Sequence, residues 1–330
     1  MSQLRMSLAC WNYDRTRALM DGSVQPQGID LNYLNMPVEE TFFRMLRHQE
    51  FDAAEMSLSS YTVSLFKPQR EFVAIPVFPS RFFRHSCIFV NADSGIREPR
   101  DLIGKRVGNP EYQMTAPVWI RGILSDHYGV PVDSVTYRTG GEEQPGRPEK
   151  LKLDLPANIR VEPIGETQTL SQMLLDGEID ALYTARTPST FLTGGGRVRR
   201  LFDNFVDVER QYFRDTGIFP IMHTVAIRTE LYQSNRWVAQ SLYKAFLEAH
   251  RRNYEDLMET AALKTSLPWL TAHVEETRRE MGDDFWPYGL DRNRKTLETF
   301  LRYHFEQGLS KRLLTPNELF APESLEFFKI

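Results

Sequence analysis

The chain has 330 residues, of which 41% are hydrophobic, 25% charged and 12% aromatic, a composition typical of a globular protein with room for two hydrophobic cores. Forty Lys and Arg residues face 44 Asp and Glu residues, so the net charge of −4 gives no general attraction to nucleic acid or to an anionic membrane. The longest apolar runs are far shorter than the ~20 residues of a membrane-spanning helix. Disordered, fibrous and membrane-spanning chains are therefore excluded.

The first part of the chain alternates short apolar segments with an amphipathic segment. Residues 4–10, 28–35 and 53–58 predict strands, and residues 39–46 predict a helix with Phe42, Phe43 and Leu46 on one face. Alternation of this kind is typical of parallel sheets covered by helices.

The middle of the chain continues the alternation but contains a long segment rich in glycine and proline. Long loops of this kind in folded domains are often functional. In chain order we expect an extended segment at 86–91, a helix at 115–128, a loop at 139–150, a helix at 170–175 and a strand at 179–184.

The last third begins with an extended segment at residues 221–227 and is then predicted to be helical nearly to the end. The two extended segments near 86–91 and 221–228 bracket a middle block, as in a chain that passes twice between two lobes. We therefore predict an α/β, two-lobed fold, with residues 1–88 plus 224–330 in one lobe and 89–223 in the other. Ligands of such folds bind in the cleft between the lobes.

Several common enzyme motifs are missing. The sequence has no Gly-x-Gly-x-x-Gly, no Gly-Lys-Ser/Thr loop and no Gly-x-Ser-x-Gly, and its seven histidines include no His-x-His or His-Glu-x-x-His pair. We therefore expect no dinucleotide or P-loop site, and with only two cysteines no preformed transition-metal site. The apolar stretch at residues 6–11 turns polar too soon for a secretory signal, and the two cysteines, Cys10 and Cys87, suit buried thiols in a reducing cytoplasm.

The segment 81–85 has the sequence Arg-Phe-Phe-Arg-His, in which Arg81, Arg84 and His85 flank two phenylalanines. Guanidinium groups bind carboxylates through two hydrogen bonds, and neighbouring rings exclude water and stack on planar ligands. This segment is typical of a pocket for an aromatic acid. The alternative is a solvated turn whose arginines pair with surface carboxylates.

A second cluster, residues 109–122, occupies a predicted strand-to-helix turn, where free backbone N–H groups favour anions. Glu111 there is either a cap-like acid or a catalytic carboxylate, and Tyr112 and Thr115 adjoin it. Arg121 either reaches the cleft or covers the surface.

His223 lies in an apolar run on the returning segment, a place where a histidine is more often part of the core. However, His85 lies on the other connecting segment, so both imidazoles are candidates for the same cleft and for proton transfer near neutral pH. Trp11, Tyr13 and Ser57 follow the first and third strands, at the strand ends where open α/β sheets bind ligands.

These segments together resemble the 4,5-dihydroxyphthalate decarboxylase family of bacterial phthalate degradation, which has the two-lobed fold of type 2 periplasmic solute-binding proteins. The resemblance covers essentially the whole chain. The Asp-Gly-Glu-Ile-Asp-Ala element is generic to solute-binding folds, whereas Arg-Phe-Phe-Arg-His, Pro-Glu-Tyr-Gln-Met-Thr and Pro-Ile-Met-His are more specific. The resemblance rests on residues 51–57, 81–86, 104–108, 110–116, 139–141, 176–182, 220–223 and 286–289.

The resemblance implies the removal of one carboxylate from 4,5-dihydroxyphthalate, which gives protocatechuate and CO2 without an organic cofactor. Such a reaction needs a clamp for the retained carboxylate, a base for a ring hydroxyl and an acid for the ring carbon. We assign the clamp to Arg81, Arg84 and Arg121. His85 and His223 are the base and acid in either order, with Glu111 as an alternative acid. The remaining substrate-binding candidates are Trp11, Tyr13, Ser57, Tyr112 and Thr115.

Two other functions stay open at this point. One is a non-catalytic receptor that captures an aromatic acid for a transporter, and the other is a ligand-sensing module. The expected partner in each case is a small aromatic dicarboxylate or similar acid, with no nucleic acid and no membrane, and a homo-oligomer is compatible with the sequence. The missing export signal favours the enzyme over the receptor.

Overall fold

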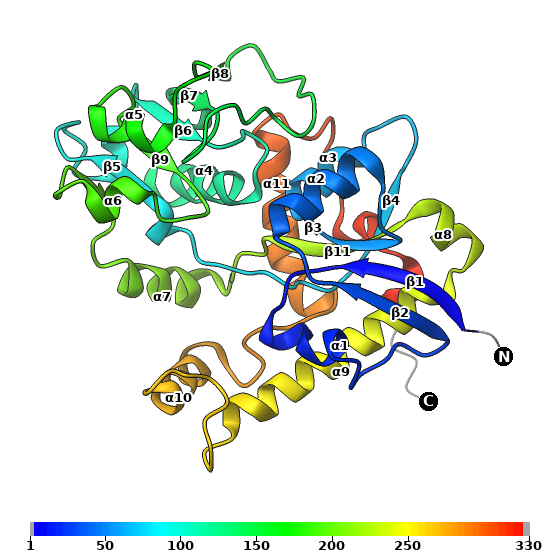
Figure 1. The fold of residues 1–330 in the computed structure, drawn as a ribbon. Helices are drawn as coiled ribbons and strands as arrows, with labels where there is room; N and C mark the ends of the chain where they lie inside the picture. Colours follow the sequence, from blue (N-terminus) through cyan, green and yellow to red (C-terminus); the bar gives the residue numbers. More distant parts are fainter. Residues whose placement is uncertain (1–2, 326–330) are drawn as a thin grey trace. The chain divides into compact units, whose positions relative to one another are not determined.

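The computed structural model describes residues 3–325, and the chain folds into two compact units. The first unit consists of the described residues within Met1–Arg81, Ile221–Leu297 and Thr315–Ile330. The second unit consists of Phe82–Pro220 and Glu298–Leu314. Each unit has its own sheet (Figure 1).

The first unit is built on a five-stranded sheet with the order β2-β1-β3-β11-β4. β1, β2 and β3 are parallel, whereas β11 runs antiparallel to both β3 and β4. β11 thus inserts a late segment of the chain beside β3. The strands are β1 (Leu4–Ala9), β2 (Ile29–Leu34), β3 (Ala53–Ser57), β4 (Phe72–Ile75) and β11 (His223–Arg228).

The helices near this sheet begin and end where the sequence pattern indicates. α2 (Val38–His48) buries Phe42, Met45 and Leu46 on one face and packs on β3, which confirms the predicted helix. α3 follows β3 directly, and the Ser57 hydroxyl caps it by accepting a hydrogen bond from the Ser60 N–H. The further helices of this unit are η1 (Asp14–Thr16), α1 (Arg17–Met20), α3 (Leu58–Ser64), α8 (Thr229–Ser234), α9 (Trp237–Met258), α10 (Leu270–Met281), η5 (Asp291–Asn293), η6 (Pro316–Leu319) and η7 (Pro322–Ser324).

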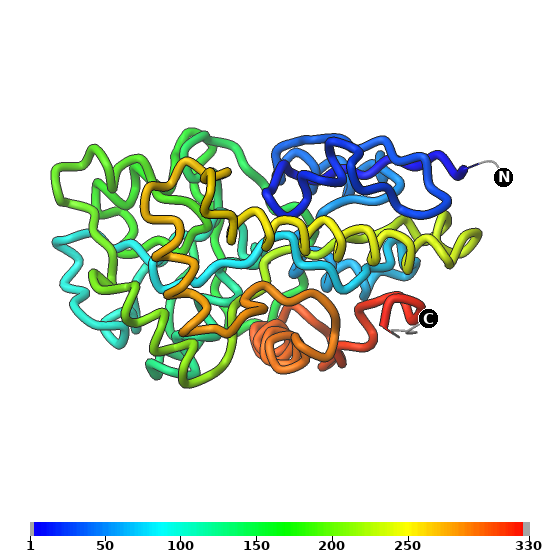
Figure 2. Tube along the Cα trace, turned by 90° about the horizontal axis from the view of Figure 1, so that it is seen from below, coloured from blue at the N-terminus to red at the C-terminus, as the bar shows by residue number. Residues whose placement is uncertain are grey.

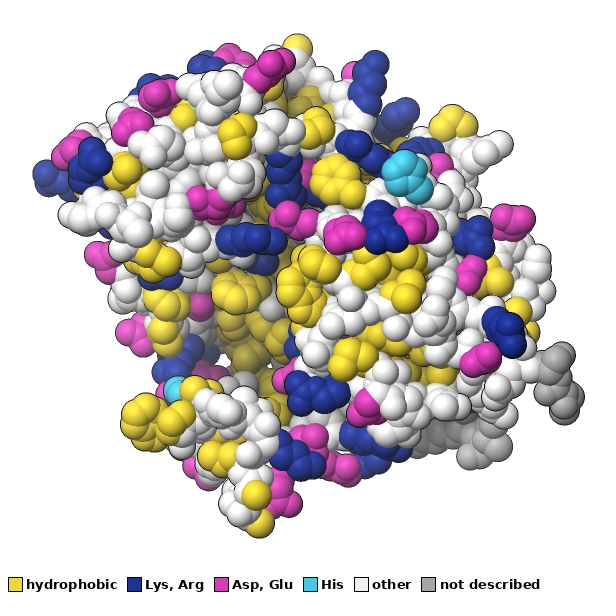
Figure 3. Space-filling view, viewed as in Figure 1, with side chains coloured by type: hydrophobic (Ala, Val, Ile, Leu, Met, Phe, Trp, Pro, Cys, Tyr) yellow, Lys and Arg dark blue, Asp and Glu magenta, His cyan; other side chains and the backbone are white. Residues whose placement is uncertain are grey.

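The long helix α9 lies beside η1 and α1 (Figure 2) and buries Val238, Leu242, Phe246 and Ala249 on one face. The prediction of helix nearly to the end is wrong for residues 259–269, for residues 282–290 and for most of the described chain after Glu306. The sequence around Pro268 interrupts the helical pattern, and α10 ends at Gly282, whose φ of 85° is a conformation that favours glycine. Exposed apolar side chains gather between α9 and α10, at the lower left of Figure 3, so this segment adds little to the core.

The second unit has a six-stranded sheet with the order β10-β5-β9-β6-β7-β8. β9, β6, β7 and β8 are parallel neighbours, while β5 runs antiparallel to β9 and to β10. The predicted helices at 115–128 and 170–175 are confirmed as α4 and α5. The strands are β5 (Ile88–Asn91), β6 (Arg106–Asn109), β7 (Thr136–Thr139), β8 (Arg160–Pro163), β9 (Ala181–Tyr183) and β10 (Val198–Arg200). The helices are η2 (His85–Cys87), η3 (Pro99–Leu102), α4 (Thr115–Tyr128), η4 (Val132–Ser134), α5 (Leu170–Asp176), α6 (Ser189–Thr193) and α7 (Phe205–Thr216).

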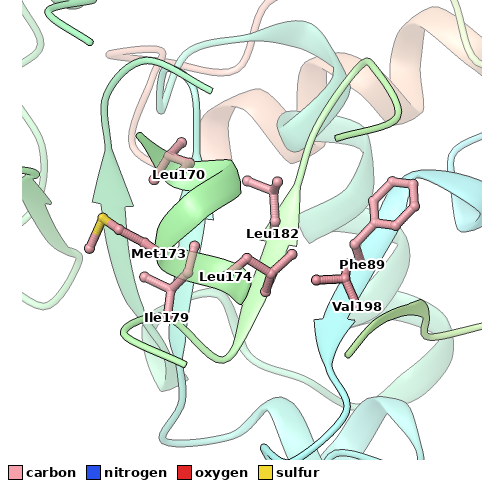
Figure 4. Close-up of a cluster of buried hydrophobic side chains, with 7 residues drawn as sticks. All are labelled: Phe89, Leu170, Met173, Leu174, Ile179, Leu182 and Val198. Atoms are coloured by element: carbon pink, nitrogen blue, oxygen red, sulfur yellow. The ribbon is translucent and has the colours of Figure 1, made fainter. Parts of the chain in front are cut away.

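One core of the second unit lies between α5 and the sheet (Figure 4). A Cβ atom at Gly108 would lie 2.7 Å from Ile179 Cδ1, so glycine at this point of β6 makes the close approach to the sheet possible. The buried side chains of this cluster are Phe89, Leu170, Met173, Leu174, Ile179, Leu182 and Val198.

The division into units differs from the predicted lobe boundaries at both connections and near the C-terminus. Residues 82–88 and Glu298–Leu314 group with the second unit, and residues 221–223 group with the first. α11 (Arg294–Glu306) therefore spans the boundary between the units. Its later part packs on α4, where a Cβ at Gly122 would collide with the Tyr303 ring. Nothing local in the sequence indicates this pairing of distant helices.

Candidate active site

In the first unit, polar side chains meet at the carboxyl end of β3. Glu55 lies in the middle of this fully buried strand, and in the antiparallel register His223 of β11 lies opposite Ser57. Alternate residues of a strand share one face, so His223 is the diagonal neighbour of Glu55 on the same face of the sheet. β1 is the parallel neighbour of β3, and the residues that follow β1 therefore pass close to Glu55.

Four groups surround the Glu55 carboxylate. His223 Nδ1 lies 2.6 Å from Oε1, and the Tyr13 hydroxyl donates to the same oxygen at 2.7 Å. The Trp11 backbone N–H donates to Oε2 at 3.2 Å, and the Cys10 thiol lies 3.6 Å from it. Both carboxylate oxygens therefore have partners, which a buried charge requires.

These partners keep Glu55 ionised. Burial raises the pKa of Glu55. The charge and hydrogen bond of His223 and the hydrogen bonds of Tyr13 and Trp11 together lower it by more than burial raises it, so the net pKa lies below its usual value. Burial and the nearby Glu55 raise the pKa of Tyr13, which therefore stays a hydroxyl donor. The Glu55 side chain is 0% exposed and that of His223 is 16% exposed, so the carboxylate supports the imidazole from the buried side.

Arg15 lies beside this cluster. Its guanidinium stacks on the Tyr13 ring at 4.2 Å and on the Trp286 ring at 4.3 Å, measured to the ring centres. Its Nε donates to the Pro79 carbonyl at 2.6 Å, and its Nη1 donates to Asp14 at 2.9 Å. A cation is thus held firmly next to the Glu55 cluster.

In the second unit, polar side chains meet at the carboxyl edge of the sheet. Asn109 ends β6, Glu142 follows β7 and Thr184 follows β9, and these three strands are parallel neighbours. β5 runs antiparallel to β9, so His85, just before β5, lies at this edge too. This is the edge at which open α/β sheets bind ligands.

His85 is buried among aromatic rings. The rings of Tyr128, Phe202 and Tyr212 lie 5.3–5.9 Å from its own, centre to centre, and neither ring nitrogen has a hydrogen-bond partner among residues 3–325. Burial, with a smaller contribution from His127, lowers its pKa to about 4. The His85 imidazole is therefore neutral at neutral pH.

Glu142 is a buried carboxyl group of the opposite kind from Glu55. Its Oε2 accepts a hydrogen bond from the Thr184 hydroxyl at 2.5 Å, while its Oε1 has no partner within the described part of the chain. Burial is the main cause that raises its pKa to about 7. Asn109 Nδ2 and both polar atoms of the Gln113 amide are also buried and have no partner among these residues.

The structure places the predicted acid Glu111 in an ion-pair cluster. Arg147 donates to it at 2.7 Å from Nη2 and 3.0 Å from Nε, and Lys150 also contacts it. Glu111 thus anchors the long loop before β8 to the turn that follows β6. Its role as a catalytic acid stays a prediction that these contacts do not support.

Two of the three predicted clamp arginines bind protein acceptors. Arg81, in the first unit, donates to the Pro287 carbonyl at 2.7 Å and to Asn293. In the second unit, Arg121 donates to Gln307 at 2.7 Å and to the Tyr112 carbonyl at 2.6 Å. These guanidinium groups connect segments that are distant in sequence, so their assignment to a substrate clamp is a prediction without support from these contacts.

The other predicted residues fall into both units. Trp11 and Tyr13 surround Glu55 with His223, whereas Ser57 is buried as the cap of α3. In the second unit Arg84 lies over the Phe82 ring and 3.5 Å from Cys87 Sγ. Tyr112 is buried with its hydroxyl on the Gln307 carbonyl, and Thr115 begins α4.

Sequence reasoning did not single out Glu55, Glu142, Arg15 or Thr184 as site residues. Glu55 carried a usable signal, because it is a charged residue inside an otherwise apolar strand. Glu142 lay in the long predicted loop without a distinguishing pattern.

Cys10 and Cys87 are free and buried, which confirms the expectation of buried thiols. Within residues 3–325, no group of three or more His, Cys, Asp or Glu side chains could hold a metal ion. In the same range no helix is both long and apolar enough to cross a membrane.

The arrangement of the two sheets defines a periplasmic-binding-protein-like α/β fold. The periplasmic aliphatic sulphonate binding protein SsuA of Escherichia coli superposes with a TM-score of 0.54 at 12% identity, over 97% of this chain and 98% of that one. At this identity the likeness shows the fold alone, and it confirms the predicted fold class. No family model matches the sequence.

Relatives of known activity identify the family. The chain is 43% identical over 330 residues, the full length of both proteins, to the 4,5-dihydroxyphthalate decarboxylase of Comamonas testosteroni. It is 46% identical over 202 residues to that of Pseudomonas putida, which covers 61% of this chain and 78% of the relative. The chain belongs to the 4,5-dihydroxyphthalate decarboxylase family and is a carboxy-lyase, which confirms the resemblance seen in the sequence.

Proposed function

We propose that this protein decarboxylates 4,5-dihydroxyphthalate to protocatechuate and CO2, and that His223 supported by Glu55 delivers the proton to the ring. The substrate follows from the names of the curated relatives. The observation that carries the proposed mechanism is the 2.6 Å contact between His223 Nδ1 and the buried carboxylate of Glu55. A carboxylate in this position orients an imidazole and stabilises its protonated form.

The chemistry of the substrate makes an organic cofactor unnecessary in this proposal. Each ring carboxylate has a hydroxyl group para to it. When that hydroxyl releases its proton, its electron pair moves to the ring carbon that bears the leaving carboxylate, and this carbon accepts a proton. The bond to the carboxylate then breaks, CO2 leaves, and the electron pair of that bond restores the aromatic ring.

The two histidines differ in a way that favours one as the acid. The pKa of Glu55 lies below its usual value, so an ionised carboxylate sits beside His223 Nδ1, whereas burial lowers the pKa of His85 to about 4. We therefore assign the acid to His223 and leave His85 as a candidate acceptor. Tyr13 and the Trp11 N–H act as positioning groups, because they hold Glu55 in place and do not need to touch the ring.

Arg15 is our candidate for the carboxylate that the substrate retains. Its guanidinium is held flat between two aromatic rings beside the Glu55 cluster, and a planar guanidinium binds carboxylates through paired hydrogen bonds. Arg15 also donates to protein acceptors, as Arg81 and Arg121 do, and we prefer it because it lies over the Tyr13 ring beside Glu55. A cytoplasmic location and a homo-oligomer stay predictions.

The test is turnover in D2O. Purified protein is incubated with 4,5-dihydroxyphthalate, with and without a chelator, and CO2 and the product are measured. We expect equal amounts of CO2 and protocatechuate, with one deuterium on the carbon that carried the lost carboxylate. Binding without CO2 release would instead indicate a receptor. Loss of activity with the chelator would overturn the cofactor-free mechanism.

A further inference from the structure

The second unit contains several buried polar atoms that find no partner within residues 3–325. Those near the ends of β6 and β7 include Asn109 Nδ2, Gln113 Nε2 and Oε1, and Glu142 Oε1, and the Asn109 and Gln113 side chains are fully buried. A buried donor or acceptor without a partner costs as much as a lost hydrogen bond, so native proteins pair such groups with protein, water or ligand. A group of them in one region therefore indicates an occupant.

These atoms belong to one edge of the sheet. Asn109 is the last residue of β6, Gln113 lies in the turn between β6 and α4, and Glu142 follows β7, the parallel neighbour of β6. Glu142 is further fixed by Thr184, which follows β9 on the other side of β6. The ends of three adjacent strands thus place these groups at one carboxyl edge of the sheet: β6 and β7 supply the unpaired atoms, and β9 supplies the Thr184 hydroxyl that binds Glu142.

The chemistry of the unpaired atoms points to neutral groups that both donate and accept. An amide side chain offers two N–H donors and an acceptor oxygen, and a carboxylate offers acceptors. Burial raises the pKa of both Glu142 and Glu149 to about 7, so the edge disfavours additional negative charge. A hydroxyl group suits this environment because it donates one hydrogen bond and accepts others.

We infer that this edge of the second unit binds the paired ring hydroxyl groups of a dihydroxylated aromatic acid, with Glu142 as the residue that determines specificity for them. Glu142 Oε1 accepts a hydrogen bond from one hydroxyl, and the Asn109 and Gln113 amides complete the set. Thr184 is a positioning residue, since its hydroxyl holds the other Glu142 oxygen. The inference rests on the proposed function for the identity of the ligand, but it concerns recognition and not the chemical step.

The test compares two ligands that the protein does not decarboxylate in this reaction, protocatechuate and benzoate, which differ only in the two hydroxyl groups. Dissociation constants are measured by calorimetry for the wild type and for Glu142→Gln. We expect the wild type to prefer protocatechuate. At pH 8, where Glu142 is ionised, the variant should lose about 10- to 100-fold in affinity for protocatechuate, the effect of a lost hydrogen bond to a charged acceptor, and should bind benzoate as before.

Glu143→Gln is the matched control, because Glu143 is the next residue, is exposed and binds Ser189. We expect it to change neither affinity. A second variant, Gln113→Met, removes the amide that lies beside Glu149, so it should weaken protocatechuate binding and leave benzoate binding unchanged. Unaltered protocatechuate binding in both Glu142→Gln and Gln113→Met, or equal losses for both ligands, would show that water alone occupies the edge.

The outcome is separable from that of the proposed function. If the wild type prefers protocatechuate through Glu142 but releases no CO2 from 4,5-dihydroxyphthalate, the proposed function fails and the hydroxyl site stands. If CO2 is released while Glu142→Gln leaves the preference for protocatechuate intact, the hydroxyl site fails and the proposed function stands.

Discussion

Glu55, in the middle of β3, and Glu142, which follows β7, are both buried carboxyl groups, but their surroundings in the two units differ. In the first unit both oxygens of Glu55 have partners, and the pKa lies below its usual value. In the second unit one oxygen of Glu142 has a partner, and the pKa rises to about 7. Burial removes water and disfavours the charged form of a carboxyl group, whereas hydrogen-bond donors around it favour that form.

The difference matches the roles that we propose. The ionised Glu55 carboxylate holds the His223 imidazole in place, which suits a residue that delivers a proton. Glu142 Oε1, which has no donor among residues 3–325, gains most from a ligand that brings a hydroxyl donor to it. One edge is therefore suited to proton transfer and the other to recognition.

The largest expected effect comes from His223→Asn. This change removes the proposed acid but leaves Glu55 with its Tyr13 and Trp11 donors, so we expect kcat for CO2 release to fall ~10²–10⁴-fold. The control is His273→Asn, since His273 is exposed on α10 and should have normal turnover when substituted. Near-normal CO2 release by His223→Asn would remove this residue from the mechanism.

Glu142→Gln tests the raised pKa of Glu142 by its effect on how the unfolding free energy depends on pH. The folded protein holds a proton on Glu142 up to about pH 7, whereas the unfolded chain releases it near the ordinary pKa of 4.5, so wild-type stability falls as pH rises through this window. The variant cannot titrate there. Its unfolding free energy relative to the wild type should increase by up to about 3 kcal/mol between pH 4 and pH 8, measured by denaturant unfolding.

Glu55→Gln should show the opposite sign. The pKa of Glu55 is lowered in the folded protein, so its contribution to stability is present above the ordinary pKa of 4.5 and is lost as pH falls through the folded value. In the variant, the unfolding free energy should no longer fall through Glu55 protonation below pH 4.5. Its slope against pH between pH 4.5 and 7 should equal that of the wild type. The same slope change in both variants would contradict the contrast between the two sites.

The smallest expected effect comes from Tyr13→Phe, which removes one hydrogen bond to Glu55. We expect kcat to fall about tenfold, because hydrogen bonds to a charged group are worth about 1.5–3 kcal/mol and three other contacts to Glu55 persist. Tyr33→Phe is the control, since the Tyr33 hydroxyl binds Trp11 O and Thr16 and does not contact Glu55. An equal fall in kcat in both variants would show that the effect comes from altered packing near β1 and not from the hydrogen bond to Glu55.

The sequence by itself determined the fold class, most of the elements that carry the site, and the family. Hydrophobic periodicity located β1, β2, β3, β11, α2 and α4, because burial of one face imposes that spacing locally. It also identified His223 and Tyr13 as candidates, since both lie at predicted strand ends.

Only the tertiary structure decided which groups those residues meet. Glu55 and His223 are 168 positions apart and become neighbours because β11 inserts between β3 and β4. In the same way, Arg81 and Arg121 read as anion binders in the sequence but are bound to acceptors more than 180 positions away. The charge state of a buried side chain depends on its nearest donors and acceptors, and distant segments of the chain supply them.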